Sequence, residues 1–420
     1  MKYKKLLIFI VLLFILTSCT NINNKTSSNL PLETSSENLS SPTSSNIVSS
    51  PSSLPVSSKE LTEEEIINEK VETYLENMTL SQKIGQLFII TPNQLETAES
   101  DTSDNVADFS QIQKSNIVDY SPGGIIFFDN NINNGEELKQ YINELQDNSK
   151  IPLFISVDEE GGQVSRLSGK PDTGIDHIPP MGTIGENGDP KEAFELGQTL
   201  GSGLNSLGFN LNFAPVADIN TNPYNPVIGD RSFGSTPEIV SSMVSEEVKG
   251  MQSKNVSACL KHFPGHGDTS SDTHTGRVIL DVDAERLNET ELKPFKAGIE
   301  SDADFIMISH ISLPQITEDD TPSSMSSIII KDILRKDLNF NGIVITDALN
   351  MSAITNYNSS AETALNCINA GVNILLMPDS FKNAFTAIKD AVDNKEIKES
   401  LIDESVRKIL YIKFKRNIIN

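Results

Sequence analysis

Eight short runs of apolar, often β-branched residues alternate with amphipathic helical stretches along the chain. This alternation is typical of parallel βα units. The runs lie at 87–91, 124–128, 153–158, 211–217, 257–262, 305–310, 343–347 and 373–377. We therefore predict an α/β fold with a single (β/α)8 TIM-type barrel over residues 61–420, with enlarged loops between its units. An open, doubly wound sheet is the alternative, because periodicity does not distinguish a closed sheet from an open one.

Signals for helix ends agree with this alternation. Asp189 and Pro190 suit the N-cap and first turn of a helix that Gly208 would end. Thr79 begins a Thr-Leu-Ser-Gln segment that matches a capping box, and a last helical pattern follows the eighth run at 400–415. These signals place helices before, between and after the strands, as a barrel requires.

The N-terminus has the pattern of a secretion signal. Three early lysines precede an apolar run at 6–16, which is too short to cross a bilayer comfortably. The run leads into Leu16-Thr-Ser-Cys19, which resembles a bacterial lipobox, so we predict that 1–19 is a lipoprotein signal peptide and that Cys19 is lipidated. An ordinary signal peptide with an incidental Cys is the alternative. We expect an extracytoplasmic protein that is lipid-anchored to the cell membrane.

Composition separates one segment from the rest of the chain. Residues 20–60 consist mainly of Ser, Thr, Asn and Pro, so we predict a disordered tether between the anchor and the barrel. The whole chain has 58 acidic and 33 basic residues, a net charge of −25, and no basic stripe. We therefore expect no nucleic-acid partner. Its three cysteines are too few for a disulfide framework.

Polar residues follow one predicted strand after another. The carboxyl ends of barrel strands meet on one face, where active sites of this fold lie. The residues in question are Asp158, Asp218, Lys261, His262, His310 and Asp347. The densest cluster is Lys261-His-Phe-Pro-Gly-His-Gly-Asp-Thr-Ser-Ser-Asp-Thr-His274, which contains three of the five histidines of the chain. We therefore expect a functional site on this face.

Two features of this face suggest catalysis. Asp347 ends an apolar strand, where an acid is costly to bury without a partner or a task, and its carboxylate could attack an electrophilic carbon. A structural cap for the next helix is the alternative. Asp272 and His274 point to the same side if their segment is extended, so the carboxylate could orient the imidazole for acid/base catalysis. A solvated pair of loop residues is the alternative here.

The same loop has a second interpretation, as a metal site. Zinc can bind His262, His266, Asp268, Asp272 and His274. Their spacing is irregular, however, and no Cys lies among them. We therefore expect neither a metal nor another cofactor.

Several motifs together resemble family 3 glycoside hydrolases of the β-N-acetylglucosaminidase (β-hexosaminidase) type. The resemblance extends from about residue 61 to the C-terminus, with the motifs in the order of that family. They are Met78-Thr-Leu-Ser-Gln-Lys-Ile-Gly-Gln86, Asp158-Glu-Glu-Gly-Gly-Gln-Val-Ser-Arg-Leu167, Phe213-Ala-Pro-Val-Ala-Asp218, Asn225-Pro-Val-Ile-Gly-Asp-Arg-Ser-Phe-Gly234, Lys261-His-Phe-Pro-Gly-His-Gly-Asp-Thr269 with Asp272-Thr-His274, and Ile345-Thr-Asp-Ala-Leu-Asn-Met351.

The resemblance implies a role for individual residues. Asp347 would be the nucleophile that forms a covalent glycosyl–enzyme with retention of configuration, and His274 the acid/base with Asp272 as its partner. Substrate binding is implied for Asp158, Arg166, Arg231, Lys261 and His262. An Asp-x-His dyad within the barrel, rather than an acid/base from a second domain, implies GlcNAc rather than glucose as the sugar.

The function implied is that of a retaining exo-β-N-acetylglucosaminidase. Its carbohydrate substrates would be peptidoglycan fragments (muropeptides) or chitooligosaccharides with terminal β-linked GlcNAc. A phosphorylase of the same family and a catalytically silent sugar-binding lipoprotein are the alternatives. The chain departs from the family pattern at Thr275-Gly-Arg-Val278, where relatives often have Leu-Pro. Arg277 is therefore expected to affect the mobility of the loop or the binding of the leaving group.

Overall fold

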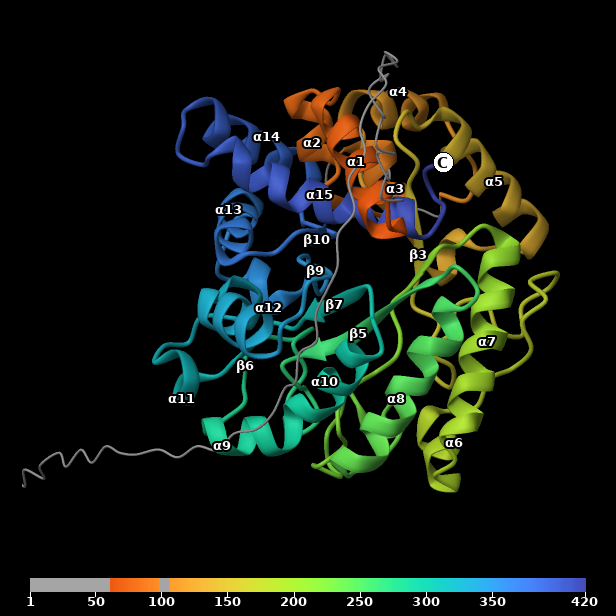
Figure 1. Ribbon diagram of the computed structural model, residues 1–420, viewed down its shortest axis with the longest axis vertical. Coiled ribbons are helices and arrows are strands. Elements are labelled where there is room, and N and C mark those ends of the chain that lie inside the picture. The colour runs from red at the N-terminus through yellow and green to blue at the C-terminus, as the bar shows by residue number, and fades with distance from the viewer. Residues whose placement is uncertain (1–60, 99–105) are drawn as a thin grey trace, which may run out of the picture. The chain divides into compact units, whose positions relative to one another are not determined.

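Eight parallel strands form a barrel in the computed structural model of the protein, with helices around it (Figure 1). The structure describes residues 61–98 and 106–420. The predicted signal peptide, Cys19 and the linker at 20–60 lie outside the described residues. The strand order is β10-β1-β2-β3-β4-β5-β7-β9. These strands are β1 (Phe88–Ile90), β2 (Gly124–Phe127), β3 (Phe154–Val157), β4 (Leu211–Asn212), β5 (Ser257–Phe263), β7 (Phe305–Ile308), β9 (Ile343–Thr346) and β10 (Leu375–Leu376).

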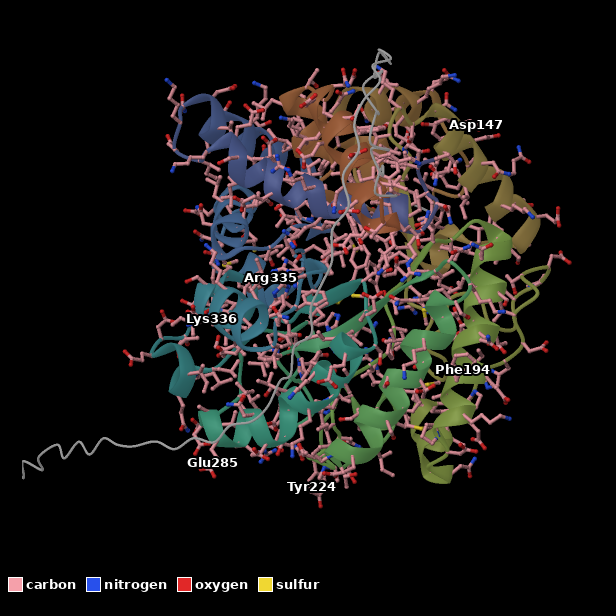
Figure 2. All side chains as sticks on the ribbon, viewed as in Figure 1. Asp147, Phe194, Tyr224, Glu285, Arg335 and Lys336 are labelled. Atoms are coloured by element: carbon pink, nitrogen blue, oxygen red, sulfur yellow. The ribbon has the colours of Figure 1, made fainter. Side chains whose placement is uncertain are left out.

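Contacts between β9 and β10 close the barrel. The backbone N–H of Asn373 donates to the carbonyl of Val344 at 2.8 Å, and that of Thr346 donates to the carbonyl of Ile374 at 3.1 Å. The Asn373 side chain accepts hydrogen bonds from the Val344 amide and from Arg335, which is labelled in Figure 2. Since β10 also pairs with β1, the predicted (β/α)8 barrel is confirmed and the open-sheet alternative is wrong.

All eight predicted strands are present, but most are shorter than predicted, and the fourth (211–217) and eighth (373–377) have only two residues each. Regular pairing in β4 ends at Asn212 because Pro215 has no N–H to donate to a ladder. The chain returns to the sheet at Val216, which forms a bridge with Lys261. A separate parallel pair, β6 (Val278–Ile279) with β8 (Ile311–Ser312), was not predicted, because two-residue strands give no alternation to detect.

Helices of varied length follow the strands and surround them (Figure 1). Within the described part of the chain, no helix is long and apolar enough to span a membrane. The α-helices are α1 (Glu63–Glu76), α2 (Leu80–Gly85), α3 (Pro92–Thr97), α4 (Gln111–Tyr120), α5 (Gly135–Asn148), α6 (Met181–Asn187), α7 (Pro190–Leu207), α8 (Pro237–Gln252), α9 (Ala284–Arg286), α10 (Leu292–Glu300), α11 (Pro314–Thr317), α12 (Ser352–Thr355), α13 (Ser360–Ala370), α14 (Phe381–Asp393) and α15 (Glu399–Lys415). The π-helices are η3 (Leu287–Glu291) and η5 (Ile328–Asp337), and the 3-10 helices are η1 (Asp129–Asn131), η2 (Gly229–Arg231) and η4 (Ser323–Met325).

The predicted helix ends are confirmed. Thr79 and Gln82 form both hydrogen bonds of a capping box at the start of α2. Asp189 is the N-cap of α7 and accepts a hydrogen bond from the Lys191 amide. Gly208 ends α7 with a φ of 100°, a conformation that glycine adopts without steric cost.

A buried lysine lies at the end of the barrel opposite the carboxyl ends of the strands. Phe154 and Phe305, the first residues of β3 and β7, make an edge-to-face contact with ring centroids 5.2 Å apart. Lys413 lies over the Phe154 ring and donates hydrogen bonds to Gln86 at 2.7 Å and to the Gly123 carbonyl at 3.0 Å. Burial lowers the pKa of Lys413 well below its usual value. Both acceptors are neutral, so neither offsets the effect of burial on the amine.

Lys413 predicts a pH dependence of stability. The Lys413 amine takes up a proton when the protein unfolds. Its contribution to the free energy of unfolding therefore rises with pH until the pH reaches the usual lysine pKa. In Lys413→Met this contribution disappears. The free energy of unfolding, measured with urea, should therefore rise less between pH 7 and pH 10 than it does in the wild type. Lys415→Met is the matched control, because acidic neighbours raise the pKa of Lys415. The prediction would be contradicted if the free energy of unfolding rose with pH equally in the wild type and in Lys413→Met.

Candidate active site

A pocket of about 190 Å³ opens at the carboxyl ends of the strands. It is smaller than the usual range of about 300–1,000 Å³ for pockets that hold drug-sized ligands, and so suits a single small ring. Every predicted site residue of the barrel lines it except Asp272, which lies behind His274. These residues are Asp158, Arg166, Arg231, Lys261, His262, His274 and Asp347.

Lys261 is the centre of a network of charges in the pocket wall. Its ammonium lies 2.6 Å from a carboxylate oxygen of Asp158 and 2.5 Å from one of Glu160. Arg231 contacts both oxygens of Glu160 through Nε and Nη2, each at 2.8 Å, and donates from Nη1 to the Val227 carbonyl. The network joins the loop after β3, the loop after β4 and the strand β5. Lys261 and Arg231 each keep N–H groups for a ligand.

Glu160 is a member of this network that sequence analysis missed. Burial alone would raise the pKa of its carboxyl, but Lys261 and Arg231 outweigh burial and lower that pKa to about 2. Burial likewise opposes the charge of Lys261, whereas Asp158 and Glu160 raise the pKa of the lysine. Both partners therefore stay charged at neutral pH. Glu160 lies within the motif that begins at Asp158. This motif has three acids in a row, and nothing in it shows which two of them contact the lysine.

Asp218, which was expected on this face but was given no role there, holds the two histidines of the Lys261–Thr269 motif. It is fully buried and accepts hydrogen bonds from the His262 ring at 2.7 Å and from the backbone N–H groups of His262 and His266. Burial would raise the pKa of Asp218, but His262 and His266 lower it. With its Nδ1 turned to Asp218, His262 can present its other ring nitrogen to the pocket. The acid at the end of the predicted fourth strand was the signal for this role.

Asp347 lies at the end of β9, in the pocket. Its carboxylate accepts a hydrogen bond from the Ala348 amide at 2.8 Å. Burial would raise the pKa of Asp347, but His262, His310 and that amide lower it, so the carboxylate is ionised. The His310 ring lies 3.1 Å from the Ala348 carbonyl, which belongs to the next peptide along the chain. The alternative role of Asp347 as a helix cap is wrong, because the next helix, α12, begins after Met351.

The predicted pairing of Asp272 with His274 is present. The two side chains meet at 2.7 Å between Oδ1 and Nδ1, and the same oxygen accepts the His274 backbone N–H at 2.8 Å. Burial would raise the pKa of Asp272, but these two hydrogen bonds lower it. The His274 side chain remains 67% exposed, so its free ring nitrogen can reach a molecule at the mouth of the pocket.

Glu159 organises the loop that carries Arg166. Its carboxylate accepts backbone N–H groups from Arg166, Leu167 and Ser168. Arg166 itself lies over the Phe128 ring in the pocket, and its buried Nε has no hydrogen-bond partner among the described residues. A buried guanidinium nitrogen without a partner is a donor available to a ligand.

In the described residues, the candidate metal ligands of the loop make separate contacts. No group of three or more His, Cys, Asp or Glu side chains there is arranged to hold a metal ion. His262 turns to Asp218, His266 to Thr269 at 2.7 Å, and Asp268 to Thr221 at 2.8 Å. Asp272 and His274 pair with each other, so the five candidate ligands do not form one cluster.

The closed barrel and the charged pocket at its carboxyl face are those of a (β/α)8-barrel enzyme. The sequence profile described as "Glycosyl hydrolase family 3 N terminal domain" matches residues 79–412. The chain therefore belongs to glycoside hydrolase family 3, as its motifs suggested.

Individual relatives agree with this assignment. Beta-hexosaminidase A of Pseudoalteromonas piscicida is 34% identical over 322 residues, covering 70% of this chain and 54% of that protein. A beta-hexosaminidase of Nitrosomonas eutropha is 33% identical, covering 66% of this chain and 80% of that protein. A solved family 3 β-N-acetylglucosaminidase from Paenibacillus sp. str. FPU-7 is 36% identical with a TM-score of 0.74, covering 81% of this chain and 63% of that one. The chain thus spans about half of the first relative.

The network around Lys261 predicts the effect of removing Glu160. Glu160→Gln leaves two cations with less compensation and should lower the free energy of unfolding at pH 7 by on the order of 3 kcal/mol. A depressed carboxyl pKa contributes stability above the unfolded value of 4.5, and this is lost as pH falls toward 2. The difference in free energy of unfolding between the wild type and Glu160→Gln, measured with urea, should therefore become smaller as the pH falls from 4.5 toward 2.

A matched control is Glu195→Gln, which removes an exposed pair with Lys191 and should leave the free energy of unfolding almost unchanged. An effect of Glu160→Gln as small as that of the control would contradict the arrangement of charges described here.

Proposed function

We propose that the protein is a retaining exo-β-N-acetylglucosaminidase. The observation that carries the proposal is the convergence of an ionised Asp347 and the Asp272–His274 pair on one small pocket. A nucleophilic carboxylate and a separate acid/base on the same pocket are what retaining glycoside hydrolysis requires. The beta-hexosaminidase and β-N-acetylglucosaminidase names of its relatives support the choice of sugar.

The proposed reaction has two steps. In the first, Asp347 attacks the anomeric carbon while His274 gives a proton to the glycosidic oxygen, and the leaving group departs as an alcohol. In the second, His274 takes a proton from water, whose oxygen attacks the same carbon and releases the Asp347 carboxylate. Two inversions give net retention. Asp272 would orient His274 and stabilise its charged form in both steps.

The pocket wall suits an N-acetylated sugar. Lys261, Arg231 and Arg166 supply donors for hydroxyl and acetamido oxygens, and Asp158 and Glu160 supply acceptors. His262 would contact the same sugar from the end of β5. A pocket of this size favours removal of one terminal unit at a time, so the proposed mode of action is exo.

The natural substrate proposed is a peptidoglycan fragment with terminal GlcNAc. Support comes from the sequence of the N-terminus, where the predicted lipidation of Cys19 would hold the enzyme outside the cytoplasmic membrane, near the cell wall. One acyl chain gives only reversible binding, so stable anchoring would need more than one.

The activity test uses the purified full chain with nitrophenyl β-GlcNAc, with and without phosphate, beside Asp347→Ala. We expect nitrophenol and free GlcNAc in both buffers, and only the background rate in the variant, because the nucleophile is missing. His274→Ala should slow cleavage of chitooligosaccharides by about 10²–10⁴-fold. Acceleration by phosphate with a sugar-phosphate product would indicate the phosphorylase, and glycan binding without turnover would indicate a sugar-binding protein.

The anchoring test compares the wild type with Cys19→Ser in a bacterial host. We expect the wild type in the membrane fraction with incorporated labelled fatty acid, and the variant without label. Equal labelling of both proteins would contradict lipidation at Cys19 and leave the ordinary signal peptide as the interpretation.

A further inference from the structure

The segment that carries His274 is attached to neighbouring segments of the protein at both of its ends. At its N-terminal end, Asp268 accepts a hydrogen bond from Thr221 at 2.8 Å, and the Thr269 carbonyl accepts one from Asn222 at 3.0 Å. At its C-terminal end, β6 (Val278–Ile279) pairs with β8. The acid/base histidine therefore lies in a short span between two fixed attachments.

Within this span, two contacts join it to the loop that follows the nucleophile. The Thr273 carbonyl accepts a hydrogen bond from the Ala353 amide at 3.2 Å. The Arg277 guanidinium lies over the Tyr357 ring, with its central carbon 3.9 Å from the ring centroid. Ala353 belongs to α12, which begins five residues after Asp347. The catalytic histidine and the catalytic aspartate are thus linked through one loop.

The loop after β9, which carries Tyr357, is packed firmly into the protein. Ala353 and Ile354 in α12 are each only 1% exposed, and the Tyr357 amide donates to the Ile354 carbonyl at 3.0 Å. Tyr357 itself is 52% exposed, so its ring is open to Arg277 from the solvent side. No ion pair joins Arg277 to an acidic residue in the described part of the chain. Its main protein contact through the guanidinium is therefore this ring.

We propose that the stack of Arg277 on Tyr357 positions His274 against Asp347. The guanidinium–ring contact restricts movement of the segment that carries His274 across the protein surface. The hydrogen bond from Ala353 to Thr273 fixes the distance of this segment from the loop after β9. Arg277 is a positioning residue, because it acts through the loop rather than on the sugar. The inference rests on the proposed roles of Asp347 and His274, and it explains a position where the motif departs from the family pattern.

The kinetic test separates positioning of the acid from other effects. Arg277→Leu should lower kcat/KM for diacetylchitobiose, whose leaving group needs the acid, by about two- to five-fold, the factor expected for an exposed cation–π contact. For dinitrophenyl β-GlcNAc, which needs little proton donation, kcat/KM should stay unchanged. Tyr357→Ala should match Arg277→Leu, Tyr357→Phe should retain wild-type values, and the double variant should lose no more than either single one.

Arg407→Leu is the matched control, since it removes an exposed arginine paired with Glu72 far along the chain from the loop. Arg277 also borders a cavity of about 570 Å³ with Asn358 and Asn366. If Arg277→Leu impairs only GlcNAc-MurNAc, whose leaving group is anionic, and spares chitobiose, the guanidinium binds substrate and the positioning role is overturned.

A second measurement does not depend on activity. Amide hydrogen exchange of the 270–277 segment should be faster in Arg277→Leu and Tyr357→Ala than in the wild type and Arg407→Leu. Unchanged exchange would overturn the inference even if the enzyme is active. Absence of turnover in the wild type, together with faster exchange in the variants, would overturn the proposed function while leaving the contact established.

Discussion

The buried charge of Lys261 is the constraint on which the site depends. An ammonium group taken out of water is stable only if carboxylates surround it, and here Asp158 and Glu160 do so at hydrogen-bond distance. Arg231 in turn compensates Glu160. Because these residues come from β5 and from the loops after β3 and β4, their charges can balance only when the barrel is closed and the loops are in place. The network of charges in the pocket wall therefore requires the folded barrel.

A second balance of charge operates around the proposed nucleophile. Asp218 is satisfied by the motif histidines, which leaves Asp347 as the ionised carboxylate facing the open part of the pocket. The proposed acid/base pair, Asp272 and His274, lies apart from both, and the His274 side chain is exposed to solvent. Buried charges in the wall and a separate, exposed histidine suit a reaction in which the same imidazole first gives and then takes a proton.

Local signals in the sequence predicted what depends on neighbouring residues. The strands, the caps at Thr79 and Asp189, and the pairing of Asp272 with His274 all involve groups within a few positions of one another, and all are present. The pairing of Glu160 with Lys261 joins residues about one hundred positions apart, and no local pattern separates it from that of Asp158. Asp218 was expected on the face of the site, but its role as the partner of the two motif histidines was not predicted, for the same reason.

The sequence by itself determined the eight βα units, the face that carries the site and most of the residues that line it. It did so because strand periodicity and strand-end polar residues are local, and because family motifs mark individual positions. Only the tertiary structure decided which acid meets which base, that the candidate metal ligands have separate partners, and that Arg277 stacks on Tyr357. These outcomes depend on distances between segments remote in sequence, which become defined only when the barrel closes between β9 and β10.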